Sequence, residues 1–196
     1  MTLARTFSVA LVGVTGHLIE VEVDIANGLP ATILVGLPDT ALREARDRIR
    51  AAIINSGESW PNSKITVGLS PAALPKRGSG FDLAIAIAVL AASDALPLTA
   101  PAGKMFLAEL GLDGRLRPVP GVLPAVAAAE HRVDTVVVAA QNGGTSTSPV
   151  PGMRAPATEW IDVTSIAAAV SSLGRIVGSR SASIVLPAPG GPSSDR

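Results

Sequence analysis

The residues with the clearest chemical potential lie in the segment from 73 to 92, ALPKRGSGFDLAIAIAVLAA. Ser79 stands between two glycines, Lys76 and Arg77 come just before it, and Asp82 opens an apolar run. A serine at the start of a helix can be a nucleophile, part of a phosphate cradle or a helix cap. Each of these readings gives the protein a different function.

The spacing of Ser79 and Asp82 favours the helix cap. Ser-x-x-Asp has the form of a capping box, in which the serine oxygen accepts an amide hydrogen and the acid returns to the cap amide. The helix dipole favours an acid in the first turn, and that acid disfavours an anionic ligand at the same place. We therefore expect Ser79 and Asp82 to form a helix-capping motif.

A peptidase is the alternative for this segment. Its serine would need a base, and the chain has three lysines, Lys64, Lys76 and Lys104. We expect Lys76 to be exposed in a loop and Lys104 to begin a strand, and neither has a sequence signal for desolvation. A Ser79 nucleophile with Lys76 or Lys104 as base remains a competing hypothesis.

Other catalytic patterns are missing from the sequence. GxxxxGKS/T, GxSxG and HExxH do not occur, and GSGFDL has too few glycines for a dinucleotide-binding turn. His17 and His131 stand alone. The absence of cysteine excludes thiol catalysis, disulfides and cysteine-ligated zinc, and it is compatible with a cytoplasmic location. We predict no cofactor, metal or small-molecule substrate for this chain.

The composition describes a globular chain with an aliphatic core. Hydrophobic residues make up 47% of the 196 positions and aromatic residues 3%, with 16 basic and 16 acidic side chains. Zero net charge argues against a chain-wide attraction to nucleic acid or membrane, but it allows a local basic patch. The longest apolar run, 83–92, is too short to span a bilayer.

The periodicity predicts the elements that hold these residues. Residues 7–14 and 17–25 alternate as a hairpin with a turn at TGH, and a strand follows at 31–38. A helix from Asp39 or Thr40 to Ser56 buries a stripe at spacings of three and four. Further along the chain we expect strands at 63–71, 104–110 and 134–140, a hairpin at Asp113-Gly114, and helices at 79–92, 121–132 and 161–174.

Two polar surfaces accompany these elements. The helix ending at Ser56 carries four arginines and two acids on the face opposite its buried stripe, and we expect this face to be solvated. Candidate contacts with DNA or a partner are the basic residues Arg43, Arg46, Arg50, Lys76 and Arg77. Glu20, Glu22 and Asp24 alternate along one strand, which predicts a solvated row more readily than a metal cage.

Three long segments resemble the ComM/YifB family of Mg-chelatase-like AAA+ ATPases. They are VEVDIANGLPATILVGLPDTALREARDRIRAAIINSGESWP, ITVGLSPAALPKRGSGFDLAIAIAVLAAS and FLAELGLDGRLRPVPGVLPAV. The resemblance covers about residues 3–175 and concerns the N-terminal domain of that family. One departure is Gly68, where the family has asparagine.

The resemblance implies an α+β fold like domain 2 of ribosomal protein S5, which is also the fold of the Lon protease domain. Laid on Lon, the catalytic serine falls at Gly80 and the catalytic lysine at Leu123, so the resemblance implies loss of proteolysis. Asp82 matches the DLA sequence shared with RadA-like domains. The implied domain spans residues 1–177, and the Gly/Ser/Pro-rich residues 178–196 predict a disordered tail.

The family's full-length members are ATP-dependent motors of DNA branch migration. Their Walker motifs do not occur in these 196 residues, so ATP and Mg²⁺ are expected only in a downstream ATPase domain that this chain lacks. We expect a truncated form that contacts DNA, copies of itself or an AAA+ ATPase, and no membrane. An idle gene remnant is the remaining alternative.

Overall fold

A computed structural model describes residues 2–35, 40–76, 78–130, 132–140 and 159–178 of the chain. At 40–43, 159–162 and 175–178 only the backbone is described. The elements in chain order are β1 (Thr2–Val12), β2 (Thr15–Ala26), β3 (Ala31–Val35), α1 (Thr40–Asn55), β4 (Lys64–Ser70), α2 (Asp82–Ala92), β5 (Lys104–Leu107), β6 (Glu109–Leu110), β7 (Leu116–Arg117), α3 (Val122–Ala129), β8 (Thr135–Ala139), β9 (Glu159–Val163) and α5 (Ile166–Gly178).

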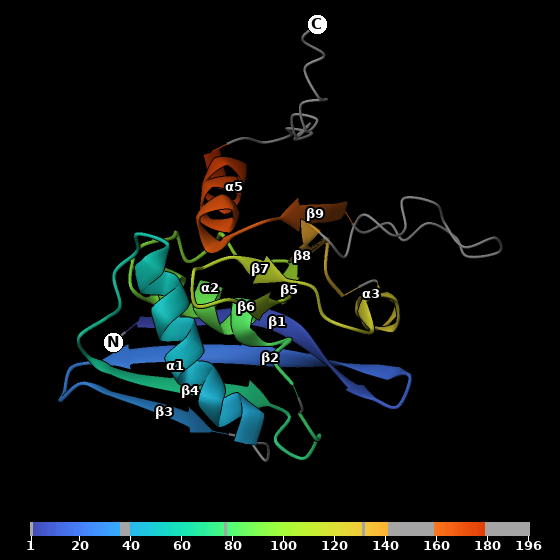
Figure 1. The fold of residues 1–196 in the computed structure, drawn as a ribbon, viewed down its shortest axis with the longest axis horizontal. Coiled ribbons are helices and arrows are strands. Elements are labelled where there is room, and N and C mark those ends of the chain that lie inside the picture. Colours follow the sequence, from blue (N-terminus) through green and yellow to red (C-terminus); the bar gives the residue numbers. More distant parts are fainter. Residues whose placement is uncertain (1, 36–39, 77, 131, 141–158, 179–196) are drawn as a thin grey trace, which may run out of the picture.

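The described residues build one mixed sheet with helices on both faces (Figure 1). Its seven strands run in the order β3-β4-β2-β1-β5-β8-β9, and β6 pairs with β7 in a separate small ribbon. The β1–β2 and β2–β4 pairs are antiparallel, and the other four pairs are parallel. The expected mixture of helices and strands is confirmed, whereas the likeness to ribosomal protein S5 stays a prediction.

Two apolar clusters hold the layers together. The larger joins α1, α2 and α5 to one face of the sheet, and the smaller joins α3 to the other face beneath β1, β5 and β8. α2 lies in the middle of the larger cluster, where all eleven of its residues are buried. Contact with β1, β2 and β5 on one side and with α1 and β6 on the other explains why it can be apolar all round.

The first hairpin differs from the prediction in its turn. Val12 pairs with Thr15, so the turn is Gly13-Val14, and TGH belongs to β2. Gly13 has a φ of 63°, a left-handed conformation that glycine adopts without strain. Val14 is 86% exposed, as expected for a residue at the tip of a surface turn.

Two later segments were also predicted wrongly. Residues 104–110, expected as one strand, divide at Ala108 into β5 in the large sheet and β6 in the ribbon. Residues 161–163, expected in the final helix, belong to β9, and α5 begins only at Ile166. The Ser165 hydroxyl accepts the Ala168 amide (3.2 Å), as an N-cap side chain does, and this marks the helix start.

Part of the sheet face opposite α1 is polar. Glu20, Glu22 and Asp24 lie in a row on this face, and Arg5 of β1 binds Glu22 (2.9 Å) and Glu20 (3.6 Å). Among the described residues no group of His, Asp and Glu side chains is arranged to hold a metal ion. No described helix is long and apolar enough to cross a membrane.

Candidate functional site

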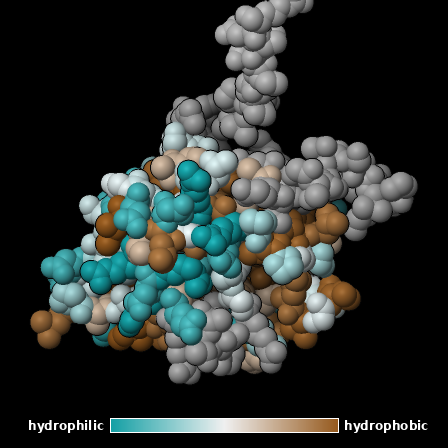
Figure 2. Space-filling view, in the orientation of Figure 1, coloured by the Kyte–Doolittle hydropathy of each residue, from teal (hydrophilic) through white to brown (hydrophobic). Residues whose placement is uncertain are grey.

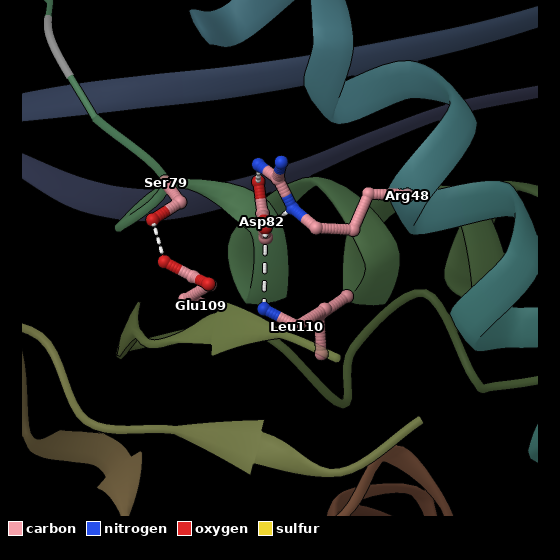
Figure 3. Close-up of polar contacts among 5 residues, drawn as sticks. All are labelled: Arg48, Ser79, Asp82, Glu109 and Leu110. Carbon is pink, nitrogen blue, oxygen red and sulfur yellow. Dashed lines mark hydrogen bonds and ion pairs between the residues drawn. The ribbon is translucent and has the colours of Figure 1, made fainter. Parts of the chain in front are cut away.

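The segment around Ser79 forms a polar cluster where α1, α2 and β6 meet (Figure 3). Arg48 of α1 donates two hydrogen bonds to the Asp82 carboxylate, at 2.6 and 3.0 Å. The Leu110 amide of β6 donates a third to the same carboxylate, at 3.2 Å. Ser79 donates from its hydroxyl to the Glu109 carboxylate. Five residues from three separate segments of the chain therefore meet here in two neighbouring sets of hydrogen bonds, each centred on a carboxylate.

The predicted capping box is wrong. α2 begins at Asp82, its N-cap is Phe81, and no side-chain oxygen caps the helix. Residues 79–82 form a turn in which the Ser79 carbonyl accepts the Asp82 amide (3.1 Å), and the Ser79 hydroxyl binds Glu109 of β6. Asp82 does occupy the first turn, as predicted, but its carboxylate reaches across to α1 and not back to a cap amide.

The ion pair between Arg48 and Asp82 is the strongest electrostatic feature of the cluster. The Asp82 side chain is fully buried, and that of Arg48 is 23% exposed. Desolvation raises the pKa of Asp82 to about 6 even though Arg48 and the Leu110 amide oppose the rise; Glu109 adds to it. The hydrogen bonds to Asp82 in turn raise the pKa of Arg48. The ion pair therefore links α1 to α2, and the core accommodates the buried Asp82 carboxylate because the Arg48 guanidinium neutralises its charge.

Sequence reasoning missed Arg48, which it placed on the solvated face of α1. The signal was present in the spacing: Arg48 lies three residues after Ala45 and four before Ala52, both of which are buried. Asp82 is the one charged residue in a helix that is otherwise apolar. A buried acid of this kind requires a cation, and the edge of the buried stripe of α1 was the place to look for it.

The structure contradicts the expectation that Lys76 is exposed. Its side chain is fully buried, and Nζ donates to the carbonyls of Pro71 (2.5 Å) and Leu74 (3.2 Å). Desolvation lowers the pKa of this ammonium. Lys76 therefore ties the loop after β4 together and is not available as a surface contact. Arg77 lies outside the described residues.

Two of the arginines of α1 that were predicted as contacts, Arg46 and Arg50, border a cleft of 590 Å³ at the edge of the sheet. Its walls come from α1, from the start of β3 and from the loop before β4: Pro30, Ala31, Thr32, Arg46, Asp47, Arg50, Ile54, Glu58, Ser59, Trp60, Pro61, Asn62 and Ser63. Figure 2 shows hydrophilic residues gathered over α1. Two of the predicted contacts, Arg46 and Arg50, are brought together here, and the side chain of Arg43 lies outside the described part.

The cleft is less basic than the sequence implies. Arg46 binds its neighbour Asp47 at 2.9 and 3.3 Å, which raises the pKa of Arg46 and lowers that of Asp47. Among the described residues Arg50 has no ion pair. Arg50 is therefore the cation of this cleft that is best placed to meet an external anion, and the partly buried Trp60 adds an aromatic side chain to the lining of the same cleft.

Comparison with known proteins assigns the chain to a family. Residues 21–142, more than half of the chain, match the family described as subunit ChlI of Mg-chelatase. The chain belongs to the ChlI family. The match extends from β2 through β8 and includes the Arg48–Asp82 cluster and the cleft.

Individual relatives of this ChlI-family chain are similar over about 72% of its length. An uncharacterized protein of Mycobacterium tuberculosis is 54% identical over 143 residues, and the competence protein ComM of Haemophilus influenzae is 46% identical over 142. The protein YifB of Escherichia coli is also 46% identical over 142 residues. Each alignment covers 72% of this chain and 28% of the relative, so the chain spans less than a third of their length. The predicted kinship with ComM and YifB is confirmed.

Proposed function

We propose that this chain is a non-catalytic contact module of a cytoplasmic ComM/YifB-type protein, with the fold of ribosomal protein S5 domain 2. In the full-length proteins the module accompanies an ATP-dependent motor of DNA branch migration, to which ATP and Mg²⁺ belong. Membership of the ChlI family and similarity to ComM support this assignment. The cleft beside α1 is the observation that carries the contact function.

The surroundings of the Lon-like positions support a module without peptidase activity. The position matching the Lon serine is Gly80, and a Cβ added there would lie 3.3 Å from Leu107. Leu123, at the lysine position, is 47% exposed and carries no titratable group. Ser79 is engaged by Glu109, and the ammonium of Lys76 is engaged by backbone carbonyls.

The proposed ligand of the cleft is DNA. A guanidinium binds phosphate through paired N–H donors, and an indole stacks on bases of any sequence. Arg50 supplies the cation, Arg46 can exchange Asp47 for a phosphate, and Trp60 supplies the indole. Phosphate contacts release counterions, so binding must weaken as salt rises.

Fluorescence anisotropy with labelled branched and single-stranded DNA, at low and high salt, tests this proposal. We expect Arg50→Ala to lower the affinity and to reduce the salt slope by roughly one. Arg115→Ala is the matched control, because Arg115 is 81% exposed, pairs with Asp113 and does not line the cleft. Equal affinities of the two variants, or no binding at low salt, would refute the DNA contact.

A serine-directed fluorophosphonate probe tests the absence of peptidase activity. We expect no labelling that depends on Ser79. Labelling of the native chain that disappears in Ser79→Ala would restore the peptidase hypothesis.

A further inference from the structure

The outer strand of the sheet, β3, has an edge that pairs with no described strand. Ala31 donates its amide to the Ser63 carbonyl (3.4 Å), so the odd-numbered residues of β3 bond toward β4. Because the direction alternates along a strand, Thr32 and Leu34 point their amides and carbonyls away from the sheet. Within the described residues no strand pairs with this edge (Figure 1).

The sequence of β3 lacks the features that usually protect such an edge. Ala-Thr-Ile-Leu-Val contains no charge and no proline, whereas exposed edges normally carry lysine, proline or a bulge. Ile33 is 43% exposed and Val35 54%, and both lie on the sheet face opposite α1. The strand therefore offers free hydrogen-bonding groups and apolar side chains together.

We propose that β3 pairs with β3 of a second copy of this chain, antiparallel about a two-fold axis, so that two sheets become one. The outward-facing residues fix the register. Thr32 of each chain lies opposite Leu34 of the other, and these two pairs form four backbone hydrogen bonds. Ile33 then lies opposite its own counterpart in a non-hydrogen-bonded pair, about 4.5 Å away between Cα atoms.

A second copy is favoured as the occupant because the edge is complementary to itself. The same pattern of donors and acceptors meets across the axis, and no charged side chain of β3 faces a like charge. The neighbouring cleft carries two arginines and two acids, Arg46, Arg50, Asp47 and Glu58, so it adds no net charge to either side. Pairing also covers Ile33, which is half-exposed in the isolated chain. This proposal is independent of the DNA contact above.

The size of the contact predicts a weak dimer. One pair of five-residue strands buries much less than the roughly 1,200 Å² of a stable interface. We therefore expect a dissociation constant of roughly 10–500 µM. Association should be visible at high protein concentration and absent in dilute solution.

Sedimentation equilibrium of the full chain, from about 10 µM to 1 mM, tests the dimer. We expect Ile33→Lys to weaken association at least about tenfold, because it places two ammonium groups opposite each other. Leu98→Lys is the matched control: Leu98 is 49% exposed, the added charge is the same, and the residue is not in β3. A monomer at every concentration, or equal dissociation constants for the two variants, overturns the proposal.

Amide hydrogen exchange tests the register directly. The amides of Thr32 and Leu34 should become protected as protein concentration rises, whereas the Ile33 amide, which bonds to β4, should be protected throughout. Concentration-independent exchange at Thr32 and Leu34 overturns the proposal, whether the amides stay open or are already covered by another segment in dilute solution. Circular dichroism of Ile33→Lys confirms that a loss of association is not a loss of folding.

Discussion

The buried pair of Arg48 and Asp82 makes the sharpest prediction about stability. Arg48→Met keeps much of the aliphatic stem but removes the guanidinium that binds Asp82 at 2.6 and 3.0 Å. The carboxylate then stays buried with the Leu110 amide as its remaining hydrogen-bond donor among the residues of Figure 3. Breaking a buried pair on one side costs about 3–5 kcal/mol. We expect about 3 kcal/mol at pH 8, because Arg48 is partly exposed.

The pH dependence of this loss follows from the pKa of Asp82. In the native chain that pKa rises from 3.8 to about 6, so the folded state holds its proton more tightly than the unfolded state does. Stability therefore falls as pH rises from about 3.8 to about 6, by at most roughly 3 kcal/mol, and is level above that range. Without Arg48 the folded pKa rises further. The loss in the variant must then be largest at pH 8 and smaller at pH 5, where Asp82 binds a proton.

Urea denaturation followed by circular dichroism at pH 8 and pH 5 measures both effects. Arg46→Met is the control on the same helix, because Arg46 is 48% exposed and its surface pair with Asp47 should contribute little to stability. Adding Asp82→Asn to Arg48→Met should recover most of the loss, since the amide oxygen can still accept from Leu110. A cost no greater than that of Arg46→Met, or one that does not change with pH, would refute the buried-pair reasoning.

Five further substitutions, at four residues, test other polar side chains by the same denaturation assay. Ser79→Ala should cost about 1 kcal/mol through its bond to Glu109, and Ser79→Asp should cost more, although aspartate would preserve a helix cap. Stability retained in Ser79→Asp would support the cap. Lys76→Met should cost about 1–3 kcal/mol and leave the salt slope of DNA binding unchanged, since the ammonium is buried; a smaller slope would show that it reaches the surface. Ser8→Ala should be neutral or stabilising, because the Ser8 hydroxyl is buried without a hydrogen-bond partner in the described structure. Thr6→Val should cost about 1 kcal/mol, because it removes the hydrogen bond from the Thr6 hydroxyl to a backbone carbonyl. Equal costs for these two would contradict the assignment.

Local pattern was a good guide wherever one segment decides its own structure. The period of α1 predicted its buried residues Ala45, Ile49 and Ala52, and Gly57 predicted its end. It was a poor guide wherever a residue is bound by a partner from a distant segment of the chain. Ser79 and Asp82 have the spacing of a capping box, but Glu109 and Arg48 offer partners that are invisible to a local motif. Similarly, the Lys76 side chain is buried because its ammonium donates to backbone carbonyls of the folded loop after β4.

The sequence by itself determined the family, the succession of most strands and helices, and the aliphatic character of the core. These properties depend on neighbours three or four positions apart, or on long ordered motifs that are read without coordinates. Tertiary structure alone decided that Arg48 faces Asp82, that Arg50 and Trp60 border one cleft, and that no described strand pairs with the outer edge of β3. The physical reason is that a buried charge, a cleft and a sheet edge are each defined by segments that the folded chain brings together from far apart.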